Sequence, residues 1–191
     1  MEVKGMIHSQ SARIAFVVAL LANGVALAGS VTSGPQVGEK VPGPFAPLNV
    51  TGPDAGKKSC QYCRNGTRPV AVIFARQFTP AVAQLVKKID AVTVANTERS
   101  LGSYAVVCSD AAGLDQQLQE AAKQMQFQNI VLTLYKAGGP ERYRLSPEAD
   151  VTVLLYNHFT VKANHAFKTG ELTEAAMDAI LADLSKMLSD N

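Results

Sequence analysis

Two cysteines separated by two residues form the pattern in this chain with the clearest chemistry. Cys60 and Cys63 lie in the segment SCQYCR. In such a pair one thiol can lose its proton readily, attack a substrate disulfide and then be released by its neighbour. Arg64, Lys57 and Lys58 are close enough along the chain to help stabilise the thiolate. The motif is not a haem attachment site, because Arg64 stands where that site requires histidine.

Other roles for the pair stay open. Cys60 and Cys63 could form a purely structural disulfide, because disulfides persist in proteins outside the cytoplasm. They could also link this chain to another, or join His158 and His165 in a two-Cys, two-His site for zinc or copper. His158 falls on a predicted hairpin turn and His165 seven residues further on, so the sequence does not make the four side chains converge. We therefore assign no metal site.

Cys108 is the third cysteine, and an odd count leaves one thiol unpaired within the chain. It ends an apolar, strand-like run that begins at Tyr104. A lone cysteine in such a run usually behaves as a small, buried and inert side chain, and that interpretation is favoured here. The alternative makes Cys108 a resolving partner for Cys60 or Cys63, or a metal ligand beside them.

Strands and helices alternate from Pro69 onward. The run VAVIFA at Val70–Ala75 is apolar throughout, as expected for a strand covered on both faces. Thr79 offers a helix N-cap and Pro80 a first helical residue. The predicted strands are Val70–Ala75, Tyr104–Cys108, Ile130–Leu134, Val151–Tyr156 and Val161–Phe167, with a short edge strand within Phe45–Val50, and the predicted helices are Pro80–Val92, Ala111–Met125 and Glu171–Leu188. This order predicts an α/β fold whose sheet is covered on both faces.

The order of elements and the residues around the first long helix resemble the thioredoxin-like superfamily. A lead-in, VGEKVPGPFAPLNVTG (Val37–Gly52), is followed by a strand and by the pattern F-x-x-x-x-T-P from Phe74 to Pro80. In these features the chain is similar to exported relatives of the peroxiredoxins and alkyl hydroperoxide reductases. The resemblance covers about residues 37–188 and implies a thioredoxin-like fold, with a central mixed β-sheet flanked by helices on both faces.

The chain departs from this resemblance at the usual active site. Peroxiredoxins carry the reactive cysteine three residues after a threonine, in the first turn of the helix, where backbone amides stabilise the thiolate. Thr79 and Pro80 match that pattern, but Val82 stands at the cysteine position. The cis-proline of the superfamily has no clear counterpart, since Pro147 comes three residues early and Asp150 precedes the strand. The family's active-site turn is therefore degenerate.

Two hypotheses for function result. One is a thiol–disulfide redox role towards a protein partner, with Cys60 as the nucleophile and Cys63 as the resolving thiol. The other is a non-catalytic binding module whose cysteines form a structural disulfide or hold a metal ion. Position bears on the choice, because the pair precedes the Val70–Ala75 strand and by default lies at its amino end. The intervening segment RNGTRP could also fold back over roughly 20 Å, which leaves the opposite end open. Substrates of open α/β sheets bind at the carboxyl ends of the strands.

The first residues have the parts of a secretory signal peptide. Lys4 and Arg13 precede the apolar run Ile14–Ala28, which ends in the sequence Ala-Leu-Ala. A spanning helix needs about 20 apolar residues, and this run is shorter, which leaves a retained anchor as the alternative. We predict that residues 1–28 are removed and that the mature chain has no stable membrane insertion. The protein is then exported, to the periplasm or the cell exterior.

The rest of the chain divides into a Pro/Gly-rich lead-in, residues 29–56, and one thioredoxin-like domain, residues 57–191. The formal net charge is +2, and runs of lysine and arginine do not exceed two residues. A basic face for nucleic acid is therefore not expected. The sequence contains no phosphate-binding glycine loop, and we predict no cofactor.

Overall fold

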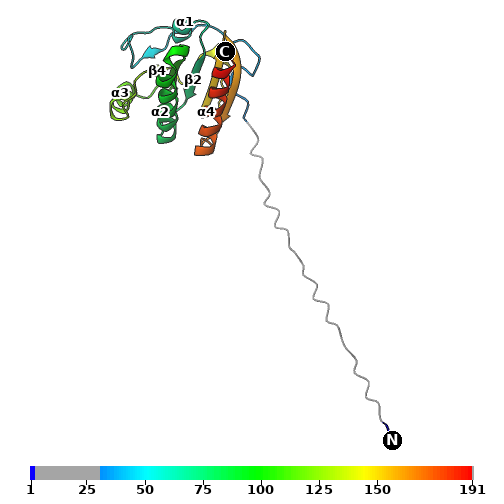
Figure 1. The fold of residues 1–191 in the computed structure, drawn as a ribbon. Coiled ribbons are helices and arrows are strands. Elements are labelled where there is room, and N and C mark those ends of the chain that lie inside the picture. Colours follow the sequence, from blue (N-terminus) through cyan, green and yellow to red (C-terminus); the bar gives the residue numbers. More distant parts are fainter. Residues whose placement is uncertain (3–30, 191) are drawn as a thin grey trace.

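The computed structural model of the protein describes residues 1–2 and 31–190 (Figure 1). The predicted signal peptide therefore lies outside the described residues, apart from its first two. Within the described part of the chain, the helices are too short or too polar to cross a lipid bilayer.

A six-stranded mixed β-sheet forms the centre of the fold, with the strand order β1-β4-β3-β2-β5-β6. β2 pairs in parallel with β3 and antiparallel with β5, so it lies in the middle of the sheet. The strands are β1 (Leu48–Asn49), β2 (Val70–Ala75), β3 (Gly102–Cys108), β4 (Val131–Tyr135), β5 (Val151–Asn157) and β6 (Thr160–Phe167). Each predicted strand is confirmed, with ends shifted by one or two residues and a shorter edge strand.

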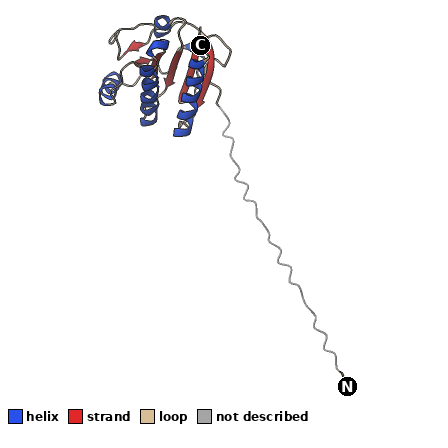
Figure 2. Ribbon diagram, in the orientation of Figure 1, coloured by secondary structure: helices blue, strands red, loops and turns tan. Residues whose placement is uncertain are grey.

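Three long helices cover one face of this sheet (Figures 1 and 2). The other face is covered by a one-turn helix, a 3₁₀ turn and the lead-in segment. The long helices are α2 (Pro80–Ala95), α3 (Leu114–Gln124) and α4 (Glu174–Ser189), the one-turn helix is α1 (Gln61–Asn65), and the 3₁₀ turns are η1 (Thr97–Arg99) and η2 (Glu141–Tyr143).

Local capping explains where the helices begin. α2 starts as predicted, because the Thr79 side chain accepts a hydrogen bond from the Val82 amide and Pro80 is the first helical residue. α3 begins later than predicted, since Gly113 adopts a positive φ of 74° just before it. α4 also begins later, at the residue after its cap Thr173. Helix α1 was not predicted, because five residues are too few to show helical periodicity.

The side chains of β2 divide the core into two halves. Every residue of β2 is buried, as the apolar run predicted. Ala71 and Ile73 pack towards the long helices, while Val72 and Phe74 pack against the lead-in side. The second half is rich in aromatic rings, and Phe45 lies 5.2 Å from Tyr143, centroid to centroid. The lead-in is thus part of the packing that covers the sheet.

Asp90 on α2 joins this helix to the chain that enters β4. Its carboxylate accepts hydrogen bonds from the backbone amides of Gln128, Asn129 and Ile130, at 2.8–2.9 Å. The Asp90 residue is only 1% exposed. Hydrogen bonds to a buried charged acceptor are stronger than neutral ones, so this one side chain fixes the turn between α3 and β4.

We expect the substitution Asp90→Ala to lower the free energy of unfolding by about 3 kcal/mol, because three backbone amides lose their acceptor. Urea denaturation of the two proteins measures this difference. The control is Asp178→Ala, which removes only an exposed ion pair with Lys88 and is expected to cost less than about 1 kcal/mol. A loss for Asp90→Ala as small as that of the control would contradict the assignment.

Candidate functional site

The Cys60–Cys63 pair lies at the edge of the sheet where β2 and β3 begin, which we call the amino pole. Pro69, just before β2, accepts a hydrogen bond at 2.9 Å from the amide of Gly102, the first residue of β3. Thr67 accepts one at 3.1 Å from the amide of His158, in the β5–β6 turn. The segment after α1 is therefore tied to both neighbours of β2, and the default position predicted for the pair is confirmed.

Helix α1 rests directly on the start of β3. Asn65 is buried, and its side chain donates a hydrogen bond to the carbonyl of Gln61, 2.9 Å away. A Cβ atom at Gly102 would lie only 2.0 Å from Oδ1 of Asn65. Glycine at this position is what allows the helix to approach so closely.

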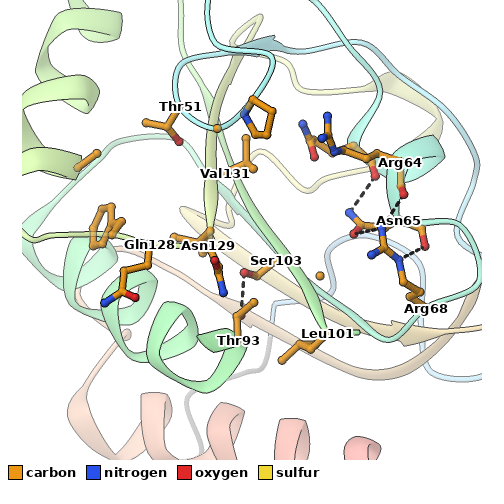
Figure 3. Close-up of a pocket in the computed structure, with 17 residues that line it drawn as sticks. Thr51, Arg64, Asn65, Arg68, Thr93, Leu101, Ser103, Gln128, Asn129 and Val131 are labelled. Carbon is orange, nitrogen blue, oxygen red and sulfur yellow. Dashed lines mark hydrogen bonds between the residues drawn. The ribbon is translucent and has the colours of Figure 1, made fainter. Parts of the chain in front are cut away.

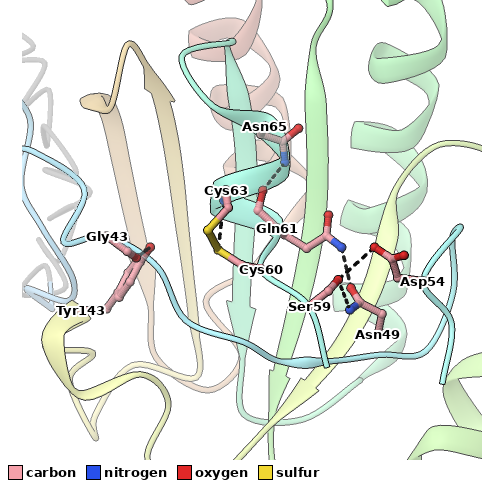
Figure 4. The surroundings of a disulfide bond; sticks show 9 residues. All are labelled: Gly43, Asn49, Asp54, Ser59, Cys60, Gln61, Cys63, Asn65 and Tyr143. Carbon is pink, nitrogen blue, oxygen red and sulfur yellow. Dashed lines mark hydrogen bonds between the residues drawn. A yellow bond between two sulfur atoms is a disulfide. The ribbon is translucent and has the colours of Figure 1, made fainter. Parts of the chain in front are cut away.

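A network of polar side chains holds the same buried face of α1 one turn earlier, at Gln61 (Figure 4). Gln61 donates to Oδ1 of Asn49 at 2.5 Å, and Asn49 donates to Oγ of Ser59 at 2.8 Å. Ser59 in turn donates to Asp54 at 3.0 Å, and Arg64 pairs with the same carboxylate at 2.6 Å. The loop between β1 and α1 is thus held to the helix by hydrogen bonds rather than by apolar packing.

Behind α1 lies a polar cavity of about 370 Å³ (Figure 3). Its walls come from α1, from the loop after β1 and from the chain entering β4. Hydroxyl groups of Thr93 and Ser103, 2.8 Å apart, lie in its floor. The charged side chains in its lining are both arginines, Arg64 and Arg68.

The disulfide itself lies on the other side of α1, away from the side chain of Gln61 (Figure 4). Cys60 is the N-cap of the helix, and its Sγ accepts a hydrogen bond from the Cys63 amide at 3.0 Å. Cys63 is exposed and Cys60 is half-buried. After reduction the same amide would favour a thiolate on Cys60, because a hydrogen bond to the charged form stabilises it.

An aromatic contact holds the β5–β6 turn against the pair. The ring of Tyr62, which stands between the two cysteines, lies 5.0 Å from the ring of Phe159. His158 and Phe159 form a two-residue turn in which both have positive φ, 49° and 59°. Such turns favour asparagine and glycine, so tertiary contacts must hold these two bulky residues in place. The turn places exposed His158 and half-buried Phe159 at the amino pole.

The degenerate active-site turn lies at the opposite, carboxyl pole of the sheet. Thr79, Pro80 and Val82 line a cavity of about 250 Å³ together with Asp150, and Val82 is only 2% exposed. Asp150 thus faces this turn, whereas Pro147 does not line the cavity. Peptide bonds are trans throughout the described residues. This turn supplies a helix N-terminus but no sulfur.

Arg76 closes the same pole. Its guanidinium donates hydrogen bonds to the carbonyls of Ala137, Ser146 and Ala149, at 2.7–3.2 Å. It thereby fixes the long loop between β4 and β5 beside the end of β2. This role of Arg76 could not be predicted from the sequence, because the three acceptors are backbone carbonyls, which any residue supplies.

Cys108 lies apart from the other two cysteines. β3 begins beside Asn65 and ends at Cys108, and seven strand residues span about 20 Å. The thiol is free and buried, and burial raises its pKa to about 12 although nearby Arg76 acts in the opposite direction. The structure therefore does not bring Cys108 to Cys60 or Cys63 as a resolving thiol.

The two histidines also lie apart from the cysteine ligands proposed for them. Nε2 of His165 pairs with Asp183 on α4 at 2.9 Å, and His158 stands exposed at the other end of β6. Groups of three or more potential metal ligands do not occur among residues 31–190. The structure does not assemble the two-Cys, two-His set.

The contacts that hold helix α1 and its cysteine pair in place were not predicted from the sequence. Asn49, Gln61 and Asn65 are polar residues in a loop-like segment, where buried hydrogen bonds leave no periodic signal. Gly102 could have been singled out, because a glycine at the start of a strand often marks a close backbone approach. The turn across Asn157–Thr160 was predicted, but not its contact with Tyr62.

No protein-family model and no curated protein matches the chain. Solved structures do resemble it. The chain is similar to a secreted Mycobacterium tuberculosis disulfide oxidoreductase homologous to E. coli DsbE, with a TM-score of 0.55 and 11% identity over 74% of this chain and 95% of that one. It is similar to the Xanthomonas campestris bacterioferritin comigratory protein, with a TM-score of 0.55 and 11% identity over 75% and 92% of the two chains. It is also similar to a yeast mitochondrial 1-Cys peroxiredoxin, with a TM-score of 0.55 and 9% identity over 82% of this chain and 78% of that one.

At sequence identities of 9–11%, these similarities establish a shared fold and nothing further. The chain has the thioredoxin-like fold, as the sequence predicted. Its cysteine pair occupies the amino pole of that fold, before β2.

We expect Cys108 to resist alkylation in the native, reduced protein. With a pKa of about 12, only about one thiol in ten thousand is ionised at pH 8. Iodoacetamide followed by mass spectrometry is expected to add two labels to the native chain, at Cys60 and Cys63, and three after denaturation. Cys108→Ser is the control and is expected to give two labels in both states. A third label added as fast as the first two would contradict the buried assignment.

Proposed function

We propose that this protein is an exported thiol–disulfide exchange protein that works through the Cys60–Cys63 pair on a protein partner. The observation that carries the proposal is the exposed disulfide at the start of α1, with the Cys63 amide bonded to Sγ of Cys60. The comparison with a secreted disulfide oxidoreductase of the same fold supports it. The basic and apolar segments of residues 1–28 support export.

The exchange follows from the two sulfur positions. In the reducing direction the Cys60 thiolate attacks a partner disulfide, so that a Cys60–partner bond forms and the other partner sulfur leaves as a thiolate. The Cys63 thiolate then attacks Sγ of Cys60, which restores the Cys60–Cys63 disulfide and releases the second partner thiolate. The partner gains two electrons and the pair loses two; the reverse sequence oxidises the partner.

The roles of the two cysteines rest on their surroundings. Sγ of Cys60 accepts a hydrogen bond from the Cys63 amide, so a thiolate is better stabilised on Cys60 than on Cys63. This favours Cys60 as the nucleophile. Cys63 lies in the first turn of α1, next to Cys60, which suits a resolving thiol. We propose no peroxidase step at Val82, because valine has no nucleophilic atom.

A structural disulfide is the competing function, and its energetic value is small. The bond closes a loop of only four residues, and the chain-entropy relation gives about 2 kcal/mol for such a loop. The loop is also held independently by the Asn49, Ser59 and Gln61 hydrogen bonds. A disulfide that contributes only about 2 kcal/mol and whose Cys63 is exposed to solvent is better suited to thiol–disulfide exchange than to a purely structural role.

The test is the reduction potential of the pair, measured in glutathione buffers with the thiols counted by mass spectrometry. We expect a value within roughly −120 to −270 mV, the range of catalytic dithiols, because the Cys63 amide favours the reduced thiolate. Cys108→Ser is the control and is expected to leave the potential unchanged. A value below about −300 mV would assign the pair to the structural class and overturn the proposal.

We expect Cys63→Ser to trap a mixed disulfide on Cys60 with a reduced and denatured test protein after oxidant treatment, because the resolving thiol is missing. Non-reducing electrophoresis and peptide mapping detect the adduct. Cys60→Ser is the matched variant and is expected to trap less. More adduct on Cys63 than on Cys60 would reverse the two roles. The double variant Cys60→Ser/Cys63→Ser, still folded by circular dichroism, gives the background.

A further inference from the structure

The chain around the disulfide carries an excess of positive charge. Between Asn49 and Pro69 it contains four basic residues and a single acidic one. All four basic residues are exposed and lie on α1 or within three positions of it or of the cysteines. They are Lys57, Lys58, Arg64 and Arg68.

The acidic residue offsets one of these four charges, that of Arg64, and an excess of three remains. Asp54 is already engaged by Arg64 at 2.6 Å and by the Ser59 hydroxyl at 3.0 Å. A further cation comes from the lead-in, where Nζ of Lys40 donates to Thr160 at 2.8 Å and to the carbonyl of His158 at 3.3 Å. Lys40 therefore lies over the same turn whose Phe159 ring contacts Tyr62 between the cysteines.

Positive charge continues behind α1 into the cavity of about 370 Å³. Its charged lining consists of Arg64 and Arg68, and its remaining polar groups include the hydroxyls of Thr51 and Ser103 (Figure 3). Arg68 also donates to the carbonyls of Arg64 and Asn65, so its guanidinium is held at the end of the helix. Cations thus flank α1 on the disulfide side and on the cavity side.

We infer that the substrates of the Cys60–Cys63 pair are anionic thiols, in which carboxylates lie next to the reacting cysteine. The inference rests on the proposed exchange function and specifies its substrate class. Attraction between unlike charges raises the local concentration of such a thiolate at the disulfide and is screened by salt. Two sources share this chemistry: a small tripeptide thiol such as glutathione, and a glutamate-rich segment around a protein cysteine.

The reaction to be measured is reduction of the protein disulfide by an added thiol. One thiolate attacks a sulfur of the pair, forms a mixed disulfide and releases the other protein sulfur as a thiolate. A second thiolate of the same kind then attacks the mixed disulfide at the sulfur of the added thiol. The products are the reduced pair and an oxidised dimer of the added thiol, so two electrons pass to the protein.

The experiment compares three peptides of equal length with one cysteine flanked by glutamates, glutamines or lysines, together with glutathione and 2-mercaptoethanol. Each second-order rate with the full-length oxidised protein is divided by the same thiol's rate with bis(2-hydroxyethyl) disulfide. This division removes differences in intrinsic thiol reactivity. At low salt we expect the glutamate peptide to exceed the lysine peptide by about tenfold, and the ratio to approach one near 1 M salt.

A matched pair of variants separates local from overall charge. Lys57→Gln/Lys58→Gln removes two charges beside the disulfide and is expected to abolish most of the preference. Lys88→Gln/Lys168→Gln removes a lysine on α2 and a lysine at the carboxyl pole, each paired with a glutamate, and is expected to keep the preference. Loss of the preference in both variants alike would overturn a local basic site.

The remaining outcomes separate this inference from the function on which it rests. Equal normalised rates for all three peptides overturn the charge preference while the exchange function stands. Failure of every thiol to reduce the pair overturns the exchange function itself. A normalised rate for glutathione near that of the glutamate peptide supports the inference with a small thiol as source. If glutathione instead reacts at a normalised rate near that of 2-mercaptoethanol while the glutamate peptide reacts faster, the charge preference is supported and the substrate is a glutamate-rich protein segment.

Discussion

The central strand β2 constrains everything else in this molecule. It hydrogen-bonds along its full length to β3 on one side and to β5 on the other, and all six of its residues are buried. The residues that lead directly into β2 therefore lie at the amino pole, and those that directly follow it lie at the carboxyl pole. In this structure residues 64–69 do not run back along the sheet, because α1 packs on Gly102 at the start of β3, so the cysteine pair lies away from Thr79 and Asp150.

The cysteine pair has a defined place at the amino pole because α1 is fixed there by contacts of its buried face. Gly102 removes the side chain that would collide with Asn65, and Asn49 accepts a hydrogen bond from Gln61, one turn earlier on the same face of the helix. Because the face of α1 that carries Gln61 and Asn65 is buried, the disulfide lies on the exposed face of the helix. There the Cys63 amide donates a hydrogen bond to Sγ of Cys60.

The sequence predicted those features that depend on periodicity and capping. The buried strand Val70–Ala75, the start of α2 at Thr79 and Pro80, and the alternation of strands and helices are confirmed by the structure. The place of the cysteine pair in the chain made the amino pole the default position but left the carboxyl pole open, and the structure decides for the amino pole. Features that depend on single long-range hydrogen bonds could not be predicted, because Asp90 and Arg76 bind backbone groups that carry no residue signature. For the same reason the seat of α1 appeared only in the structure.

The length of α1 decides which groups can support a thiolate. In a long helix many aligned peptide dipoles act on the N-terminus, and here the long helix α2 carries buried Val82 instead of a cysteine in its first turn. α1 has five residues, so its dipole contributes little. Stabilisation of a Cys60 thiolate must come from the single Cys63 amide and from neighbouring cations such as Lys58.

The electrostatic field of those cations acts on incoming substrates as well as on the Cys60 thiolate. A field that favours a negative sulfur on Cys60 also attracts negatively charged substrates and repels positive ones, since both respond to the same potential. In a site built on a long helix, reactivity comes from backbone dipoles, and the side chains remain free to select any substrate charge. Here reactivity and selection depend on the same few side chains. In the proposed exchange, the position of the pair in front of β2 therefore makes its reactivity and its choice of thiol depend on the same charges.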